Sequence, residues 1–524
     1  MLLRPTSLLF LLGLVFIADA AKVVVFFTPL SNSQVVFHTR LAEELAKEHD
    51  VTLVVPQINP SLTVSKPRSP KVKIIQHVGC APELFNAFYE AEHPWVYGSP
   101  PALDAIAMSA KFKVMLADSC NNTINNQKLL DQLRTEKFDF AFTSYLDYCA
   151  VGVIRHLEIP QWAIVMSTPP FRPMLHRVGI PSLPSIFPAF LSDYSNHMTF
   201  GERMKNLASE LFFQWYYKSG AHGGHAVMMK KAWGEDFPHL SDLVDTGSML
   251  VMNSHPDIEY PLPVTSKVVY LGGLGLDEDR NALNEPFKSF VENASKVVLV
   301  SFGTVAPAEK MPHSWKAAFE ELFRKNPSIS FVWKMDGSDA PAISKNVLRS
   351  KWIPQYDLLG NENVVAFITH GGYNSIGEAI ASGTPLVTIP LFGDQFRNAH
   401  LVKHRNCGVR VEKTNVTAEA LQNALKEVLE NKKYTLAAKE LQSIYISSPL
   451  TPGQKLRGAL NFTLAHPNYN RNLPTLPLYA LYSIDCIVVL SLSVLVVLWL
   501  FWRLLKCYYW SCCKMAYKEK EKIQ

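Results

Sequence analysis

The sequence predicts an α/β protein with two doubly wound domains, followed by one membrane-spanning helix. Short, continuous apolar runs alternate with longer helix-like stretches in both halves of the chain. Strands of that kind are buried on both faces, as in parallel sheets covered by helices. Proline-rich sequence around residues 253–270 separates the two series, and a long apolar segment follows near the C-terminus.

We expect three strands in the first half and four in the second. They are Val23–Phe27, Val51–Val55, Phe138–Thr143, Val297–Phe302, Ser330–Lys334, Val364–Thr369 and Leu386–Pro390. His255-Pro256 and Pro261-Leu262-Pro263 interrupt regular structure. We therefore predict domains over residues 21–255 and 265–445, with closing helices and a membrane-proximal segment over residues 446–483.

The N-terminus has the order of a secretory signal peptide. Arg4 precedes the apolar run Leu8–Ile17, and Ala18-Asp19-Ala20 forms a small-residue cleavage site. We predict a signal peptide over residues 1–20, with a buried helix as the alternative.

The apolar segment near the C-terminus is long enough to cross a bilayer. Ile487–Trp502 is almost purely apolar, and we predict a transmembrane helix over residues 484–504. The basic tail, residues 505–524, then lies in the cytosol by the positive-inside rule, and the body is lumenal. Its last residues, Lys520-Glu521-Lys522-Ile523-Gln524, resemble a retrieval signal, so we expect a single-pass type I protein of the endoplasmic reticulum membrane.

Smaller signals agree with a lumenal body and exclude other classes of partner. Glycosylation sequons stand at Asn121, Asn293, Asn415 and Asn461. Of the formal net charge of +5, residues 503–524 carry +4, so the body has no basic groove and no nucleic-acid partner is expected.

Cysteine and histidine spacing predicts no metal site. No Cys-x-x-Cys motif is present, and the pairing of Cys80, Cys120, Cys149 and Cys407 is left open. His222 and His225 flank two glycines without further ligands at metal spacing, so we interpret this stretch as a polar loop.

The most informative chemistry follows the strand Val364–Thr369. His370-Gly371-Gly372 forms a strand-to-helix turn, where glycines let backbone N–H groups approach an anion and the helix N-terminus adds a positive dipole. Asn374 and Ser375 add donors, and Glu378 can accept hydrogen bonds from hydroxyls. These residues predict a diphosphate cradle beside a carboxylate that binds hydroxyls.

The same stretch resembles the signature of the UDP-glycosyltransferase family. The matching residues are Trp352-Ile353-Pro354-Gln355, His370-Gly371-Gly372, Asn374-Ser375, Glu378, Pro385 and Asp394-Gln395. Ser301-Phe302-Gly303-Thr304 and Phe331-Val332-Trp333-Lys334 extend the likeness, which is greatest to the membrane-bound UDP-glucuronosyltransferase type. The resemblance implies the GT-B fold of two Rossmann-like domains, in which the N-terminal half takes the acceptor and the C-terminal half takes the UDP-sugar.

The resemblance also implies a role for each donor-site residue. Trp352 would stack on uracil, Gln355 would hold the nucleoside, and Glu378 would bind the ribose. Asp394 and Gln395 would bind the sugar hydroxyls. The diphosphate would be approached by Ser301, Gly303, Thr304, His370, Gly371, Asn374 and Ser375. The UDP-sugar is a co-substrate, and neither a cofactor nor a metal is expected.

The N-terminal half departs from the family at the catalytic pair. Family members carry a His base after the first strand, and aligning Leu41–Leu45 with the family's first helix puts Gln34 there. The usual Asp partner is replaced by Ser144. A Gln amide cannot take a proton at neutral pH. His38 and Asp147 are the nearest substitutes, with ordinary helix residues as the alternative.

Two functional classes therefore stay open. The first is an enzyme that transfers glucose or glucuronic acid, with inversion, from a UDP-sugar to a small lipophilic acceptor in the lumen of the endoplasmic reticulum. The second is a UDP-sugar-binding or ligand-binding protein with impaired catalysis. The donor signature favours the enzyme, and the changed catalytic pair favours the binder. Association with itself or with sister chains is also left open.

Overall fold

The computed structural model describes residues 20–64, 66–91, 95, 102–181, 183–189, 192–216, 223–276, 280–335, 344–469 and 477–521. The chain forms two compact units, Met1–Asn472 and Leu473–Gln524. The predicted signal peptide lies outside the described residues, except for its last residue, Ala20.

A parallel seven-stranded sheet forms the N-terminal half, in the order β3-β2-β1-β4-β5-β6-β7. The strands are β1 (Lys22–Phe26), β2 (Asp50–Gln57), β3 (Val72–Val78), β4 (Phe140–Ser144), β5 (Gln161–Met166), β6 (Met249–Met252) and β7 (Val268–Tyr270). The chain builds outward from β1 in one direction and then from β4 in the other, so the strand order reverses between β1 and β4. This is the doubly wound arrangement that the sequence predicts.

A parallel six-stranded sheet forms the second half, in the order β10-β9-β8-β11-β12-β13. The strands are β8 (Val297–Ser301), β9 (Ser330–Lys334), β10 (Val347–Ser350), β11 (Val364–Thr369), β12 (Leu386–Thr388) and β13 (Gly408–Arg410). Here the order reverses between β8 and β11. Ligands of such sheets bind at the carboxyl ends of the strands beside this reversal.

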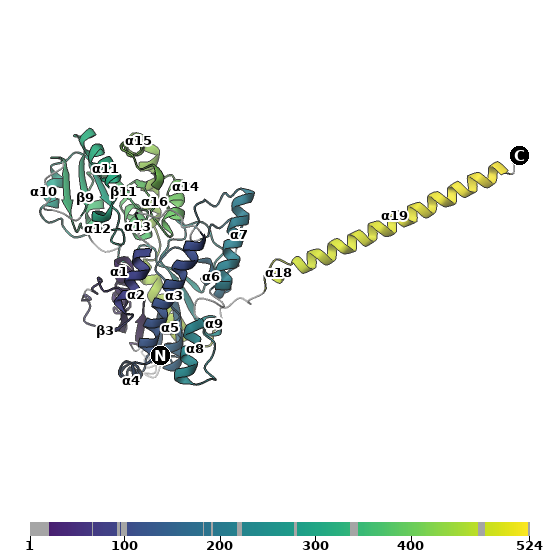
Figure 1. Cartoon of the computed structure of the whole chain (residues 1–524), viewed down its shortest axis with the longest axis horizontal. Coiled ribbons are helices and arrows are strands. Elements are labelled where there is room, and N and C mark those ends of the chain that lie inside the picture. Colours follow the sequence, from purple (N-terminus) through teal and green to yellow (C-terminus); the bar gives the residue numbers. More distant parts are fainter. Residues whose placement is uncertain are drawn as a thin grey trace, which may run out of the picture. The chain divides into compact units, whose positions relative to one another are not determined.

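Helices cover the two sheets (Figure 1). In the N-terminal half they are α1 (Asn32–Leu45), α2 (Pro82–Ala91), α3 (Ala102–Ile124), α4 (Gln127–Glu136), α5 (Cys149–His156), α6 (Arg172–Arg177), α7 (Phe200–Trp215), α8 (Gly223–Trp233) and α9 (Leu240–Val244). In the second half they are α10 (Phe287–Glu292), η3 (Ala308–Lys310), α11 (His313–Lys325), α12 (Gln355–Leu359), α13 (Tyr373–Ser382), α14 (Gln395–His404), η4 (Lys413–Asn415), α15 (Ala418–Glu430) and α16 (Lys432–Ile446).

All seven predicted strands are present, and the structure adds six more. The strands missed in the sequence are mostly short or at an edge: β6, β7, β10 and β13 have three or four residues each. β3 lies at the edge of its sheet, and most of its side chains are partly or fully exposed. β5 and β6, whose residues are all buried, have the burial of central strands.

The predicted boundary between residues 255 and 265 is wrong. β7 pairs with β6, with Val251 opposite Val269, so the first sheet continues to Tyr270. The prolines at 256, 261 and 263 interrupt the chain between two strands of one sheet, and the boundary lies after the last of these strands.

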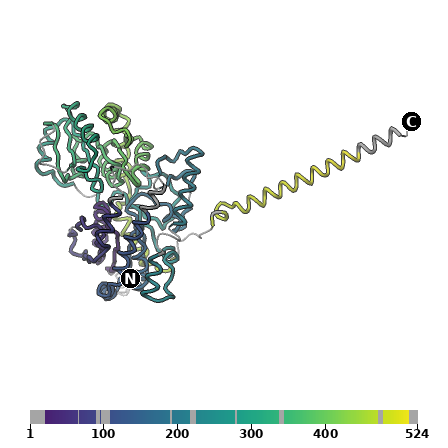
Figure 2. The backbone as a smooth tube through the Cα atoms, in the orientation of Figure 1, coloured from purple at the N-terminus to yellow at the C-terminus, as the bar shows by residue number. Residues whose placement is uncertain are grey.

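The chain then returns to the N-terminal half (Figure 2). Helix α17 (Pro452–Ala465), within the predicted closing segment, packs on α1. Leu456 and Leu460 are fully buried among the apolar residues of the first sheet, and Arg457 Nε donates to Glu48 Oε1 at 2.7 Å. The last helix of the first unit therefore fixes the two halves to each other.

The second unit contains α18 (Leu478–Leu481) and the long helix α19 (Ile484–Glu521). Within α19, Ile484–Ser511 contains an 18-residue window with a mean hydropathy of 2.7, and this segment is long and apolar enough to cross a membrane. The predicted span, residues 484–504, lies inside this helix.

Candidate functional site

The turn from β11 to α13 lies at the carboxyl edge of the second sheet, at its reversal point. Gly371 has a φ of 81°, in the left-handed region that favours glycine. A Cβ on Gly372 would lie 2.6 Å from His370 Nε2, and one on Gly303, after β8, would lie 3.0 Å from His370 Cε1. The glycines of both turns thus make room for the imidazole ring of His370.

His370 is neutral at physiological pH. Burial lowers its pKa to about 4, and the nearby positive charge of Lys334 contributes to this shift. The ring can therefore serve a phosphate as an N–H donor but not as a cation. Lys334, for which the sequence predicted no role, supplies the positive charge here. Its Nζ donates to Gly303 O at 2.9 Å and lies 5.3 Å from the centre of the Trp352 ring.

The predicted nucleoside-binding residues come together beside α13. Gln355 Nε2 donates to Glu378 Oε2 at 2.6 Å and to Ser375 Oγ at 3.2 Å. Burial raises the pKa of Glu378, while the hydrogen bond from Gln355 opposes that rise. Trp352 is 62% exposed, so its ring offers an accessible surface on which a base could stack.

Ser301 and Thr304 have different surroundings although both belong to the turn after β8. Ser301 is 1% exposed, and its Oγ accepts from Gly303 N at 3.4 Å. This hydroxyl stabilises the turn itself. Thr304 is exposed, so of the two it is the side chain accessible to a ligand.

Two side chains of the N-terminal half hold the same turn, and the sequence did not point to either. Tyr89 Oη donates to Val305 O at 2.9 Å, and Trp95 Nε1 donates to Pro307 O at 2.9 Å. Trp95 also packs against Phe302, with ring centres 5.3 Å apart. The loop expected to approach the diphosphate is thus positioned from the acceptor half.

Asp394 and Gln395 begin α14, next to this site. Asn398 Nδ2 donates to Asp394 Oδ2 at 2.8 Å, and burial raises the pKa of Asp394. Gln395 Oε1 accepts from the backbone N–H groups of Leu391 and Phe392 at 2.9 and 3.1 Å. The Gln395 carbonyl therefore shapes the preceding loop, and its amide nitrogen is the group it could offer to a sugar.

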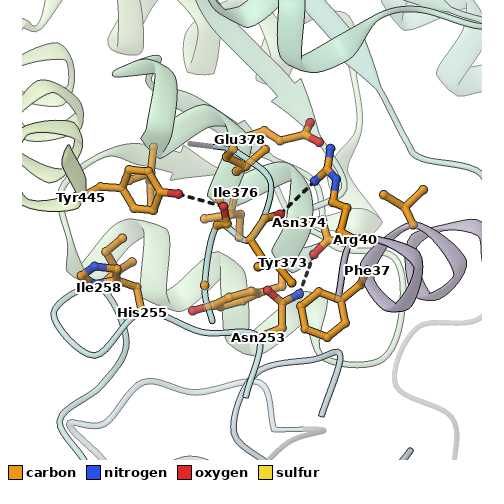
Figure 3. A pocket seen from close by; sticks show the side chains of 17 residues that line it. Phe37, Arg40, Asn253, His255, Ile258, Tyr373, Asn374, Ile376, Glu378 and Tyr445 are labelled. Atoms are coloured by element: carbon orange, nitrogen blue, oxygen red, sulfur yellow. Dashed lines mark hydrogen bonds between the residues drawn. The ribbon is translucent and has the colours of Figure 1, made fainter. Parts of the chain in front are cut away.

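A cavity lies where the two halves meet at α13 (Figure 3). Asn253, at the end of β6, donates from Nδ2 to Asn374 Oδ1 at 2.7 Å. Arg40 on α1 donates to Leu274 O at 3.3 Å, and its positive charge opposes the rise that burial causes in the pKa of Glu378. Asn374 thus joins the halves through its side-chain oxygen.

On the acceptor side, Gln34 caps a helix. Its Oε1 accepts from the backbone N–H groups of Leu30 and Ser31 at 3.0 and 3.3 Å, as the third residue of a capping box does. Gln34 therefore stabilises the start of α1 at the position where the resemblance expects a base.

His38, one turn further on, lies in the core. Its ring is 1% exposed and stacks on Phe27 with ring centres 4.7 Å apart. Nδ1 bonds to Gln34 O at 2.8 Å, and burial lowers the His38 pKa to about 4. Nε2 has no hydrogen-bond partner among the described residues.

A second cavity opens at the reversal point of the first sheet. Phe27 and Thr28, which follow β1, line it with Ser144 and Asp147 of β4 and the following turn. Ser144 Oγ accepts from Leu146 N at 3.3 Å, so this hydroxyl holds the turn in which it lies.

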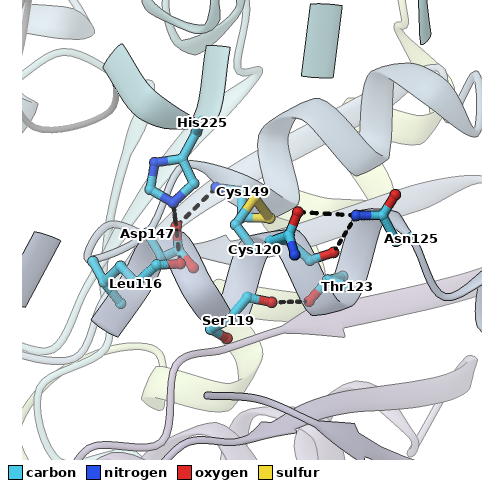
Figure 4. Close-up of a disulfide and its surroundings, with 9 residues drawn as sticks. Leu116, Ser119, Cys120, Thr123, Asn125, Asp147, Cys149 and His225 are labelled. Atoms are coloured by element: carbon cyan, nitrogen blue, oxygen red, sulfur yellow. Dashed lines mark hydrogen bonds and ion pairs between the residues drawn. A yellow bond between two sulfur atoms is a disulfide. The ribbon is translucent and has the colours of Figure 1, made fainter. Parts of the chain in front are cut away.

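Asp147 is paired with a histidine from α8 (Figure 4). His225 Nε2 lies 3.5 Å from Asp147 Oδ1 and 3.3 Å from Leu116 O. The interpretation of residues 222–225 as a polar loop is wrong for His225, which lies in a helix and is 1% exposed. A disulfide between Cys120 and Cys149, a pairing that the sequence left open, joins α3 to α5 beside this pair.

No group of three or more His, Cys, Asp or Glu residues within the described ranges could hold a metal ion.

Comparisons with known proteins agree with this geometry. The family described as UDP-glucoronosyl and UDP-glucosyl transferase matches residues 21–522. UDP-glucuronosyltransferase 1A7 of Mus musculus is 29% identical over 514 residues, covering 95% of this chain and 93% of that protein. Putative UDP-glucuronosyltransferase ugt-47 of Caenorhabditis elegans is 27% identical over 442 residues, covering 82% of each.

Solved structures have the same fold at low sequence identity. Os79 from O. sativa, in complex with U2F and trichothecene, superposes with a TM-score of 0.58 at 16% identity and covers 85% of this chain and 100% of that chain. CalG4, the calicheamicin glycosyltransferase, gives a TM-score of 0.57 at 14% identity, with coverage of 86% and 99%. The chain therefore belongs to the UDP-glycosyltransferase family and is a GT-B enzyme that transfers a sugar from a UDP-sugar.

Proposed function

We propose that the protein transfers glucose or glucuronic acid, with inversion, from a UDP-sugar in its C-terminal half to a small lipophilic acceptor in its N-terminal half. The observation that carries this proposal is the arrangement around α13. There the neutral His370, the Gln355–Glu378 pair and the exposed Trp352 ring surround one helix N-terminus. Phosphate, ribose and base each find a matching group there.

The acceptor is proposed to bind at the reversal point of the first sheet. The cavity there is lined by apolar side chains of Phe26, Phe27 and Val54 and by hydroxyls of Thr28, Thr143 and Ser144. Such a lining suits a small apolar molecule that carries one polar group.

A catalytically impaired binding protein is the second candidate, and two residues favour it. Gln34 caps α1 and Ser144 holds a turn, so each makes a local hydrogen bond instead of forming a catalytic pair. In this candidate the donor site binds a UDP-sugar without turnover.

Release of UDP distinguishes the two candidates. The purified full chain in detergent would be assayed with UDP-glucose and UDP-glucuronate over a panel of phenols, alcohols, amines and thiols. Transfer to any acceptor supports the enzyme. UDP binding without transfer to any acceptor supports the binding protein, and loss of both contradicts the donor site.

We further propose that α19 spans the endoplasmic reticulum membrane once and that the body is lumenal and glycosylated. Asn293 and Asn415 are exposed at the end of a helix and of a 3-10 turn, which suits glycan attachment. Asn121 is exposed within α3, whereas Asn461 donates to Glu48 Oε2 at 2.9 Å and suits attachment less.

Glycosidase treatment tests this topology. Asn293→Gln and Asn415→Gln are each expected to raise the electrophoretic mobility of the expressed chain by one glycan. A chain whose mobility does not respond to glycosidase would contradict a lumenal body.

A further inference from the structure

The turn after β4 presents a carboxylate to the proposed acceptor cavity. Asp147 lines that cavity with a side chain that is 11% exposed. Its Oδ1 accepts from Cys149 N at 2.9 Å and lies 3.5 Å from His225 Nε2. Both contacts use Oδ1, so Oδ2 is the oxygen that this arrangement leaves to the cavity.

His225 lies directly behind this carboxylate, with Nε2 3.5 Å from Asp147 Oδ1 (Figure 4). A carbonyl oxygen can only accept, so the contact of Nε2 with Leu116 O places the ring proton on Nε2. Leu116 O thus holds the ring in the position from which it contacts Asp147. In the catalytic pair that the resemblance expects, the histidine is the base and the aspartate lies behind it. Here the histidine lies behind, and the carboxylate faces the cavity.

The turn that carries Asp147 also lies close to the donor half. Asn253 Nδ2 donates to Ser167 O at 3.1 Å and to Asn374 Oδ1, in the donor half, at 2.7 Å. Thr168 Oγ1 donates to Tyr145 Oη at 2.9 Å. The turn after β4 thus reaches from the acceptor cavity toward a residue expected to approach the diphosphate.

His77 also lines the cavity, where its Nδ1 bonds to Val78 O at 2.9 Å. His38, a further nearby titratable group, is less well placed. It is packed between Phe27 and Phe37, and it does not line the cavity. A base must reach the proton that it removes within about 3 Å or through one water.

We propose that Asp147 is the general base that activates the acceptor and that His225 is its positioning residue; this inference rests on the proposed function. Asp147 takes the proton of the acceptor O–H, and the oxygen lone pair attacks the anomeric carbon of the UDP-sugar. The bond from that carbon to the diphosphate oxygen breaks, and UDP leaves with its electron pair. Asp147 then returns the proton to solvent.

Acceptors of different acidity test this role. A phenol that is un-ionised at the assay pH needs a base, whereas a nitrophenol that is already ionised does not. Asp147→Asn is expected to lower kcat/KM for the un-ionised phenol by about 10²–10⁴ and to leave that for the nitrophenolate within a few-fold. Asp131→Asn, on the exposed side of α4, is the matched control, and calorimetric UDP affinity reports the integrity of the donor site.

His225→Gln keeps an N–H donor and is expected to give a smaller loss with the same dependence on acceptor acidity. If Asp147→Asn fails to fold, His225→Gln tests the base assignment in its place. Equal losses for both acceptors, or no loss, would overturn the base assignment while wild-type transfer still supports the proposed function. A wild type that transfers to neither acceptor would overturn the base assignment and the proposed function together.

Helix α7 differs from an ordinary surface helix, whose buried face is apolar and whose exposed face is polar. Its buried face is polar: Asn206 and Glu210 are 0% and 2% exposed, and Glu210 pairs with Arg172 Nε at 2.9 Å. Its outer face is apolar, with exposed fractions of 37–71% for Phe200, Met204, Leu207, Leu211, Phe212 and Trp215. These residues recur at helical spacing and form one stripe.

An exposed apolar stripe of this size marks an interaction surface. Arg203 and Lys205 are exposed near its start, and aromatic rings with flanking cations are typical of helices that lie in a lipid interface. The same chain carries an apolar helix that begins at Ile484, 19 residues after α17 ends at Ala465.

We propose that the exposed face of α7 lies in the headgroup region of a phospholipid bilayer.

Photolabelling of the full chain in phosphatidylcholine–phosphatidylserine vesicles tests this proposal. A lipid with a photoreactive acyl chain is expected to label α7, and Leu207→Glu with Leu211→Glu is expected to abolish that label. Leu436 and Ile446 on α16 are exposed by 66% and 69% and serve as the internal control that stays unlabelled. Absence of label on α7, or crosslinks between α7 helices of two chains, would overturn the proposal.

Discussion

Gln34 and Ser144 illustrate how single residues alter a family site without altering its fold. Each stands where the resemblance expects a member of the catalytic pair, and each uses its side chain to stabilise the backbone next to it. A polar residue at the start of a helix or in a turn can stabilise that element by a local hydrogen bond, so α1 and the turn after β4 form without a catalytic pair at these two positions.

The donor-site residues give a direct prediction. His370→Ala and Glu378→Ala are each expected to weaken UDP binding by about 1.5–3 kcal/mol, because each removes a hydrogen bond that involves a charged group. Isothermal titration with UDP measures the loss. Unchanged affinity in a folded double variant would contradict the donor assignment.

Buried histidines predict the dependence of stability on pH. The pKa of His38 is about 4 in the folded chain and 6.5 as its reference value, so the unfolded chain binds more protons between these values. His38 therefore contributes its full stability above pH 6.5, and stability is lost as the pH falls toward 4. The cost at pH 5 relative to pH 7.5 is about 2 kcal/mol.

His38→Gln is expected to remove that part of the pH dependence. Urea midpoints of the solubilised protein at pH 7.5 and 5 would measure the change. The pKa of His370 is also lowered to about 4, so His370 would account for a similar part of the pH dependence that remains in the variant. An identical pH dependence in the variant and the wild type would contradict the buried, neutral state of His38.

At the scale of elements, the β11–α13 unit is the part that the sequence predicts best. The strand is observed over the expected residues, and the helix ends at Gly383, whose φ of 66° makes it a left-handed cap. The apolar run, the glycine turn and the capping glycine are all local signals, so no distant contact was needed to predict them.

The glycine turn also carries a prediction at this scale. Gly372→Ala would place a Cβ 2.6 Å from His370 Nε2, so the ring must move. We expect a loss of UDP affinity similar to that of His370→Ala while the fold is retained. Gly458→Ala on α17, where no atom lies within 4 Å of the added Cβ, is the control, and it is expected to stabilise the protein by about 0.5–1 kcal/mol.

At the scale of the whole molecule, buried charges join the two halves. Arg397 on α14 and Glu259, in the segment between β6 and β7, are 0% and 1% exposed and pair with each other, with Arg397 Nη1 3.2 Å from Glu259 Oε2. Arg405 Nε donates to Ile258 O at 2.7 Å. The segment that the prolines had suggested as a domain boundary is thus bound to the C-terminal half.

This pair predicts a large effect on stability. Glu259→Gln leaves the Arg397 charge buried without its partner, so we expect a loss of about 3–5 kcal/mol in the free energy of unfolding. Asp131→Asn, which breaks an exposed pair with Arg134, is expected to cost less than about 1 kcal/mol. Comparable effects in chemical unfolding of the two variants would contradict the interface described here.

The sequence by itself determined the two sheets, the donor-site turn and the apolar C-terminal helix. Each of these depends on neighbouring residues: apolar runs, glycines at fixed offsets, or the length of one segment. The tertiary structure decided what depends on residues far apart in the chain. The pairing of β7 with β6, the Asp147–His225 contact and the disulfide are examples. Such contacts form only when separate elements pack together, so no local pattern records them.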